Sequence, residues 1–249
     1  MVIPVNLEFY ARDGRRAAER GDVTVVIDVF RCSSTIVTAL RNGAAGILPV
    51  RTVKTARRLH EVHPSYLLAG ERGGVKPKGF DLGNSPREFA KEIVRGKHII
   101  LTTTDGTKAL QASRGGGPVL VGSFLNAEAV SKALYNLAKK EGRGISLVAS
   151  GLKGRASLED ILCAGRIIEY LPKGQISLSD AALIALLASK GVGDDIEKIT
   201  RSSSHGRELE LIGLGEDLHF CTRLNVYEVV PIMIGDEIVS IKKMKSASL

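Results

Sequence analysis

Short apolar runs, each followed by a polar loop and several by a helical segment, recur along this chain and limit its possible folds more than any other feature. Six such runs lie at residues 23–29, 46–50, 66–70, 98–101, 119–121 and 145–149. An apolar run of this length between turn residues is typical of a buried strand. Alternation with helices, such as those expected at residues 52–61 and 127–140, predicts an α/β fold with three layers, α/β/α, around a mostly parallel central sheet.

The C-terminal part departs from this alternation. Four further helices are predicted, at residues 158–171, 180–190, 195–200 and 204–211. Residues 226–231 are strand-like, and residues 232–241 predict a C-terminal β-hairpin with Gly235 and Asp236 as its two-residue turn. We find no linker-like or low-complexity tract, so we expect residues 1–249 to form a single domain.

A long connection at residues 71–88 contains six Gly and Pro residues, which argue against a regular element. A structureless loop of this length inside a compact domain is usually functional. Ser85 and Pro86 then predict a helix start, with Ser85 as cap and the helix running to Arg95.

The first strand, turn and helix, residues 23–40, bring reactive groups together. Asp28 and Arg31 precede three hydroxyls, Ser33, Ser34 and Thr35, at the expected helix start. A helix N-terminus suits a phosphate, and an adjacent aspartate suits a divalent cation or a nucleophilic role. An ordinary helix cap beside a surface salt bridge would give the same pattern.

Composition narrows the class of partner. The net charge of +8 permits binding of nucleic acid or of small polyanions. Nucleic-acid binders usually cluster basic residues and offer aromatic side chains for stacking, whereas here aromatics make up 4% and basic residues are spread out. We therefore expect a basic pocket for a small, highly charged substrate and no nucleic-acid partner.

Cysteine usage and hydropathy indicate location. Cys32, Cys163 and Cys221 lack metal-ligand spacing and an even count for pairing. The N-terminal residues do not resemble a signal peptide, and no apolar run approaches the roughly 20 residues of a membrane span. These features predict a cytoplasmic protein without a membrane partner. The P-loop and zinc-protease motifs are absent from the sequence.

Several segments together resemble the 2-phosphosulfolactate phosphatase family, the ComB-like proteins, from about residue 22 to 231. The segments are residues 28–35 (DVFRCSST), 70–74 (GERGG), 79–86 (GFDLGNSP), 102–107 (TTTDGT), 158–160 (LED), 163–165 (CAG), 204–206 (SHG) and 216–217 (ED) with Cys221. Their order and spacing carry the resemblance, since each motif alone is weak.

The resemblance implies a Mg²⁺-dependent phosphatase that converts 2-phospho-3-sulfolactate to 3-sulfolactate in the pathway to coenzyme M. The family usually has Asn where this chain has Asp105, which puts an extra negative charge near a polyanion. The reaction class is therefore firmer than the substrate. A phosphatase of the same class with another substrate, and a non-catalytic binder of a phosphorylated metabolite or of RNA, are the alternatives.

Mg²⁺ prefers oxygen ligands and uses one or two carboxylates while keeping several waters. The candidate ligands are Asp28 and Glu71, with one of Glu159 and Asp160. Glu159 would equally complete a capping box with Ser157.

Other residues are candidates for holding anions or moving protons. The guanidinium groups of Arg31 and Arg72 can each fork onto phosphate or sulfonate oxygens. His205 is the candidate acid that protonates the leaving alkoxide, although a turn residue would look the same. Anion-binding donors are expected at Ser33, Ser34, Thr35, Asn84, Ser85, Thr102, Thr103, Thr104 and Asp105.

The nucleophile stays open at this stage. Asp28 could attack phosphorus itself, or a water activated by Mg²⁺ could attack while Asp28 is a ligand. The expected partner is a small polyanionic phosphorylated substrate. The chain could also assemble as a homodimer.

Overall fold

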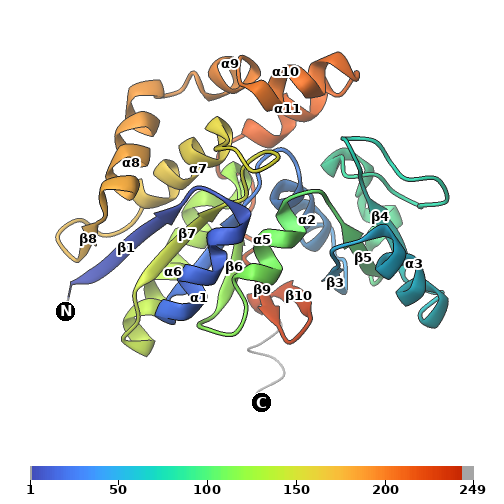
Figure 1. The fold of residues 1–249 in the computed structure, drawn as a ribbon, viewed down its shortest axis with the longest axis horizontal. Coiled ribbons are helices and arrows are strands. Elements are labelled where there is room, and N and C mark those ends of the chain that lie inside the picture. Colours follow the sequence, from blue (N-terminus) through green and yellow to red (C-terminus); the bar gives the residue numbers. More distant parts are fainter. Residues whose placement is uncertain (1, 243–249) are drawn as a thin grey trace.

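Figure 1 shows the computed structural model of the chain, which describes residues 2–242. Within these residues, one open sheet of ten strands has the order β4-β5-β3-β10-β9-β6-β2-β7-β1-β8. The strands are β1 (Ile3–Glu8), β2 (Val23–Ile27), β3 (Gly46–Pro49), β4 (Leu67–Gly70), β5 (His98–Thr102), β6 (Val119–Gly122), β7 (Ile145–Ala149), β8 (Ile176–Leu178), β9 (Pro231–Ile234) and β10 (Glu237–Ser240). Each of the six predicted runs contains a strand, and the α/β prediction is confirmed.

The sheet consists of two parallel groups joined by the C-terminal hairpin. Strands β4, β5 and β3 pair in parallel, as do β6, β2, β7, β1 and β8. The hairpin β9–β10 lies between β3 and β6 and pairs antiparallel with both, through Ile238 to Ile47 and Ile232 to Leu120. Sequence predicted this hairpin, but not its place in the middle of the sheet.

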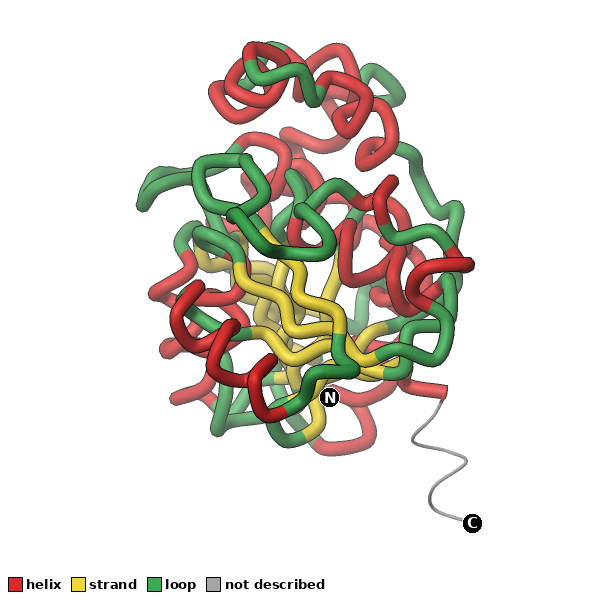
Figure 2. Tube along the Cα trace, turned by 90° about the vertical axis from the view of Figure 1, so that its right-hand side faces the viewer, coloured by secondary structure: helices red, strands yellow, loops and turns green. Residues whose placement is uncertain are grey.

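Helices cover both faces of the sheet (Figures 1 and 2). One face packs against α6 (Ala127–Glu141), α7 (Leu158–Glu169) and α8 (Asp180–Val192), and the other against α1 (Gly14–Arg20), α2 (Cys32–Arg41) and α5 (Gly106–Ala112). Helix α3 (Val53–Val62) covers β4 and β5.

Strand β2 shows how the two cores divide. Val23, Val25 and Ile27 contribute to the core with α6 and α7, whereas Val26 joins the core with α2 and α5. Successive side chains of a strand point to opposite faces, and a strand covered on both sides must be apolar throughout. This requirement explains the unbroken apolar run in the sequence.

Two sequence predictions of local structure were wrong. The helix expected from Pro86 to Arg95 is broken into a 3-10 turn, η2 (Pro86–Glu88), and a short α4 (Lys91–Val94), because Phe89 leaves helical geometry with ψ of 50°. The Phe89 side chain is buried in the core against α2. Burial of this ring takes precedence over a continuous helix.

A strand was expected at residues 226–231, but β9 begins at Pro231, so only the last of these residues lies in a strand. The amides of Asn225 and Tyr227 donate instead to the carbonyls of Phe124 and Leu125 in η3 (Phe124–Asn126). These bonds hold the segment against a turn rather than in the sheet.

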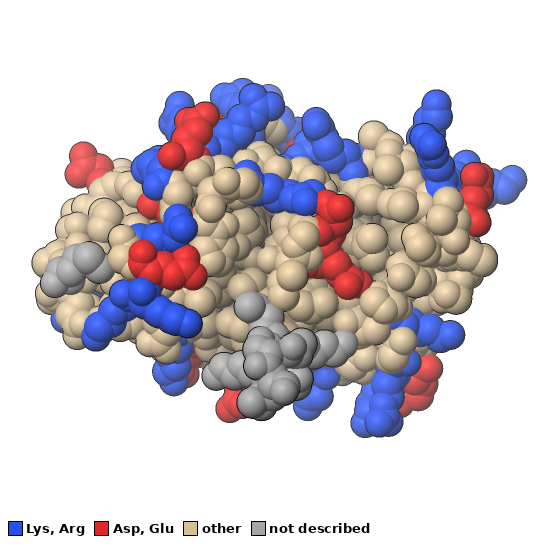
Figure 3. Space-filling model, turned by 90° about the horizontal axis from the view of Figure 1, so that it is seen from below, with Lys and Arg blue, Asp and Glu red and all other residues tan. Residues whose placement is uncertain are grey.

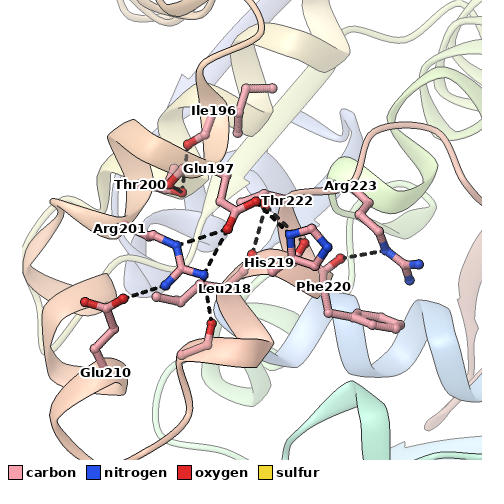
Figure 4. A network of polar contacts seen from close by, with 11 residues as sticks. Ile196, Glu197, Thr200, Arg201, Glu210, Leu218, His219, Phe220, Thr222 and Arg223 are labelled. Atoms are coloured by element: carbon pink, nitrogen blue, oxygen red, sulfur yellow. Dashed lines mark hydrogen bonds and ion pairs between the residues drawn. The ribbon is translucent and has the colours of Figure 1, made fainter.

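Three helices that precede the C-terminal hairpin form a layer above the loops that follow the strands. They are α9 (Ile196–Arg201), α10 (Ser204–Leu211) and α11 (Gly215–Thr222). Figure 4 shows the polar network that joins them: Arg201 pairs with Glu197 at 2.9 Å and with Glu210, and Glu197 also pairs with His219 at 2.8 Å. No helix within residues 2–242 combines the length and apolar character that crossing a membrane requires.

Candidate active site

A cavity of about 380 Å³ lies where the loops after β2, β4, β5 and β7 meet α10. It brings together eight of the residues singled out from sequence, namely Asp28, Arg31, Glu71, Asn84, Thr103, Thr104, Asp105 and His205. Sequence missed the apolar part of its lining, which includes Phe30, Leu209, Leu211 and Ile212. Leu211 and Ile212 are exposed large apolar residues, a signal visible only in the folded chain.

Asp28 lies at the end of β2 and caps α2. Its Oδ1 accepts the amide of Cys32, the first residue of this helix, at 3.1 Å, and the amide of Ser33 donates to the carbonyl of Asp28. Burial raises the pKa of Asp28 to about 7, and the charge of His205 opposes this rise. The carboxylates of Asp105 and Glu71 raise it further. A carboxyl that titrates near neutral pH is suited to proton transfer.

Glu71 follows β4 and organises two loops. Its Oε1 accepts the amide of Thr104 at 2.7 Å, and its Oε2 accepts the amide of Gly74 at 2.9 Å and the hydroxyl of Thr104 at 3.2 Å. Because each carboxylate oxygen has two lone pairs, acceptor capacity is left for a cation. Glu71 and Asp28 both line the cavity.

The sequence TTTDGT at residues 102–107 is fixed by close packing around Asp28. Thr103 Oγ1 accepts the amide of Thr107 at 3.1 Å and holds the start of α5. A Cβ on Gly106 would lie 2.4 Å from Asp28 Oδ2 and 2.6 Å from Cys32 Cβ. Only glycine allows α5 to approach the carboxylate this closely.

Arg31 is a buried member of an ion pair. Its Nη1 donates to Asp217 Oδ2 at 2.8 Å and its Nη2 to the carbonyl of Gly74 at 2.8 Å. The hydroxyl of Ser85 donates to Asp217 Oδ1 at 2.6 Å. From the sequence, a structural acid was favoured over a metal ligand at Asp217, and in the fold Asp217 anchors the arginine of the cavity. Ser85 reaches this anchor and lies outside the cavity lining.

His205, at the start of α10, pairs with Glu159 of α7. His205 Nδ1 lies 2.9 Å from Glu159 Oε1, and the ring meets Phe30 edge-on. Burial alone would lower the pKa of His205, but the hydrogen bond and charge of Glu159 raise it, as does the charge of Asp28. Burial alone would raise the pKa of Glu159, and His205 outweighs that effect and lowers it. Glu159 thus orients the imidazole, which lines the cavity.

We expect Glu159→Gln to lower the pKa of His205, because the substitution removes the charge that favours the imidazolium. The basic limb of the pH–activity profile should therefore move to lower pH. An NMR titration of the His205 ring in wild type and variant measures the shift directly. Equal titration curves would show that Glu159 does not control His205.

Asp160 joins two loops instead of facing the cavity. Its Oδ1 accepts the amide of Val29 at 2.8 Å and its Oδ2 accepts the amide of Gly151 at 3.1 Å. Burial, with the charges of Asp28 and Glu159, raises its pKa well above the usual range. This pattern ties the loop after β2 to the loop after β7.

The hydroxyls of Ser33, Ser34 and Thr35 point into the protein. Ser33 accepts the amide of Asp28 at 2.9 Å, Ser34 donates to the carbonyl of Val29, and Thr35 donates to the carbonyl of Asn84. All three side chains are buried and lie outside the cavity lining. Their hydrogen bonds shape the turn after β2.

Arg72 and Thr102 contact each other rather than the cavity. Arg72 Nη2 donates to Thr102 Oγ1 at 2.7 Å and to the carbonyl of Arg51 at 2.9 Å, and its Nη1 donates to the carbonyl of Glu71. The guanidinium thereby clamps the loop after β4 to the end of β5.

Asp105 lines the cavity and also meets two basic residues. Its Oδ2 accepts the amide of Lys153 at 2.9 Å, and its Oδ1 lies 3.4 Å from Lys108 Nζ. The ammonium group of Lys153 pairs with Glu208 at 2.8 Å. The cavity is therefore lined with at least as many acids as cations, and it is not the basic pocket that composition suggested.

The donor set fits a hard cation with few protein ligands. Among residues 2–242, no group of three or more His, Cys, Asp and Glu side chains has the arrangement of a metal site. The cavity instead offers two carboxylates, Asp28 and Glu71, and the Oδ1 of Asn84, a buried oxygen with no hydrogen-bond partner among these residues. Mg²⁺ keeps most of its waters and needs no more than this.

The fold and the cavity define an open-sheet α/β protein with carboxylates, a histidine and an arginine gathered where its strand-end loops meet. Comparison with known families is consistent with that description. The chain belongs to the 2-phosphosulpholactate phosphatase family, whose model matches residues 10–236. The resemblance seen in the sequence is confirmed.

Three relatives illustrate the similarity, each described as a probable 2-phosphosulfolactate phosphatase. The protein of Thermotoga petrophila is 43% identical over 211 residues, 85% of this chain and 88% of its own. That of Deinococcus radiodurans is 40% identical over 220 residues, 87% and 90%. That of Clostridium acetobutylicum is 34% identical over 238 residues, 94% and 99%.

Proposed function

We propose that this chain is a Mg²⁺-dependent phosphatase that hydrolyses a small phosphorylated hydroxy acid. The first candidate is 2-phospho-3-sulfolactate, giving 3-sulfolactate and phosphate, because relatives are described by that activity. The observation that carries the proposal is the meeting of Asp28, Glu71 and His205 on one cavity of about 380 Å³. A metal-dependent phosphoric monoester hydrolase needs oxygen ligands for its cation and gains from a proton donor to the leaving group.

The charge of the cavity supports a metal requirement. A phosphate, a carboxylate and a sulfonate carry about four negative charges together, given a phosphate second pKa near 6. Three acids of the lining, Asp28, Glu71 and Asp105, would repel such a molecule. Asp28, Glu71 and the amide oxygen of Asn84 would hold Mg²⁺, which when bound would neutralise phosphate oxygens and stabilise the charge of the transition state.

The chain's own residues then divide the proton transfers. The oxygen of a water attacks phosphorus in line with the ester bond, and Asp28 takes its proton. The bond between phosphorus and the ester oxygen breaks, and His205, held protonated by Glu159, gives its proton to the leaving alkoxide. Arg31, fixed by Asp217, has further N–H groups for the phosphate or carboxylate oxygens.

Phosphate release from 2-phospho-3-sulfolactate should require Mg²⁺ and should stop when EDTA is added in excess. Restoring Mg²⁺ should restore the rate, because hydrogen bonds within the protein hold the carboxylates of Asp28 and Glu71 in place without the ion. A panel of phosphorylated hydroxy acids lacking the sulfonate, assayed in parallel, tests substrate choice. Full activity in EDTA would contradict the metal requirement, and no release from any ester would favour a non-catalytic binder.

Binding of RNA is the alternative from a different class. Figure 3 shows one face of the molecule, where Lys and Arg side chains are spread around the margin instead of gathered in a patch. To support that function, RNA affinity would have to fall steeply with salt concentration, with a slope that corresponds to contacts with several phosphates. A cytoplasmic location, a place in coenzyme M synthesis, a homodimer and the absence of nucleic-acid and membrane partners stay predictions, as does the single domain.

A further inference from the structure

A second and larger cavity, of about 560 Å³, lies beside the candidate active site. Its walls come from η1 (Ala11–Asp13), α1, the loop after β3, the loop after β5, α5 and the loop after β7. Figure 1 shows α1 and α5 side by side there, and η1 packs against α5. Basic side chains dominate the lining: Arg12, Arg15, Arg51, Lys108 and Lys153, with Asp105 as the acid among them.

The positive charge of this cavity is only partly compensated. Lys108 has a loose pair with Asp105 at 3.4 Å, and Lys153 pairs with Glu208 at 2.8 Å. Within residues 2–242, the guanidinium groups of Arg15 and Arg51 form no salt bridge. Uncompensated cations facing a shared concavity attract anions and raise their local concentration.

Size and layout indicate the kind of anion. The volume lies within the range of about 300–1,000 Å³ typical of small-molecule sites, and it exceeds that of the candidate active site. The cations come from separate segments, Arg15 from α1, Arg51 from the loop after β3 and Lys153 from the loop after β7. Cations distributed around one cavity suit a molecule with two or more linked phosphate or sulfonate groups better than a single phosphate.

We propose that this cavity is a second anion site, which binds a small molecule carrying at least two linked phosphate or sulfonate groups. Asp105, Thr104 and Lys153 line both cavities, so the two sites share a wall. An anion bound there engages the ammonium group of Lys108 in competition with Asp105, and that of Lys153 in competition with Glu208. The proposal does not depend on the proposed phosphatase activity.

Titration of the whole protein with inorganic pyrophosphate in EDTA, followed by calorimetry, tests the site without any need for turnover. We expect saturable binding at 0.1 M salt in wild type. Its affinity should fall at least tenfold in the double variant Arg15→Ala/Arg51→Ala. Each guanidinium is exposed and free of salt bridges among the described residues, so the fold should be kept, which thermal unfolding checks.

Two controls separate this site from bulk charge and from the active site. Arg16→Ala/Arg58→Ala removes the same charge from α1 and α3 outside the cavity and should change affinity less than twofold. Asp28→Asn alters the neighbouring cavity only and should also leave affinity within twofold. Absence of binding, equal losses in the two arginine pairs, or a larger effect of Asp28→Asn than of the cavity pair would overturn the proposal.

Discussion

Asp28→Asn is expected to lower kcat by about 10³-fold or more while leaving the fold intact. The amide cannot accept a proton from the attacking water, and it is a poorer ligand for a cation than a carboxylate. Both proposed roles of Asp28 therefore fail together. The measurement is phosphate release under saturating substrate and Mg²⁺, with circular dichroism as the check on folding.

The fold should survive because the capping contact can be kept. Asp28 Oδ1 accepts the amide of Cys32, and the amide oxygen of Asn can accept the same bond. The pH dependence of stability gives a second readout, measured in EDTA. Burial raises the pKa of Asp28 from 3.8 to about 7, so its contribution to stability is present below pH 4 and is lost as pH rises towards 7.

Asn lacks this titration, so the variant should gain stability relative to wild type between pH 4 and pH 7. A constant difference across that range would show that the Asp28 pKa is not raised. Unchanged turnover would exclude Asp28 from the chemistry.

We further expect no acid-stable, hydroxylamine-sensitive phosphoenzyme in wild type after rapid quench, because the attacking group in the proposed reaction is water. Trapping one on Asp28 would make Asp28 the nucleophile.

The fold class could be predicted because buried parallel strands need continuous apolar runs. All six central runs contain strands, and the helices between them follow from the 3.6-residue spacing of their apolar residues. The insertion of β9–β10 between β3 and β6 rests on pairings between residues more than 100 positions apart. No local pattern encodes such pairings. The edge strand β8 and its neighbour β1 were also missed.

The site was predicted in outline because loops after parallel strands converge, which explains why Asp28, Glu71 and Thr104 share one cavity. What each group does depends on its partners, and those lie far away in the sequence. Glu159 was considered either as a metal ligand or as part of a capping box, and its carboxylate pairs with His205, 46 positions away. Arg72 was expected to hold substrate, but its guanidinium donates hydrogen bonds to backbone carbonyls and to the hydroxyl of Thr102.

Asp217→Ala is expected to cost about 3–5 kcal/mol of unfolding free energy, the largest stability effect of any substitution proposed. Asp217 and Arg31 form a pair with side chains only 2% and 3% exposed. Removing the carboxylate leaves a buried guanidinium without its counterion and the hydroxyl of Ser85 without its acceptor. Arg31 would also lose its fixed position at the cavity, so activity should fall as well.

Urea unfolding of wild type and variant at a common m value measures the loss. Arg201→Ala is the matched control, because it breaks the partly exposed pairs with Glu197 and Glu210 and should cost about 1 kcal/mol or less. Equal losses in the two variants would mean that burial does not strengthen the Arg31 pair. Both sets of contacts hold the helices that carry His205 and Asp217. A larger loss of unfolding free energy in Asp217→Ala than in Arg201→Ala therefore measures the effect of burying the charge, beyond the loss of a contact between helices.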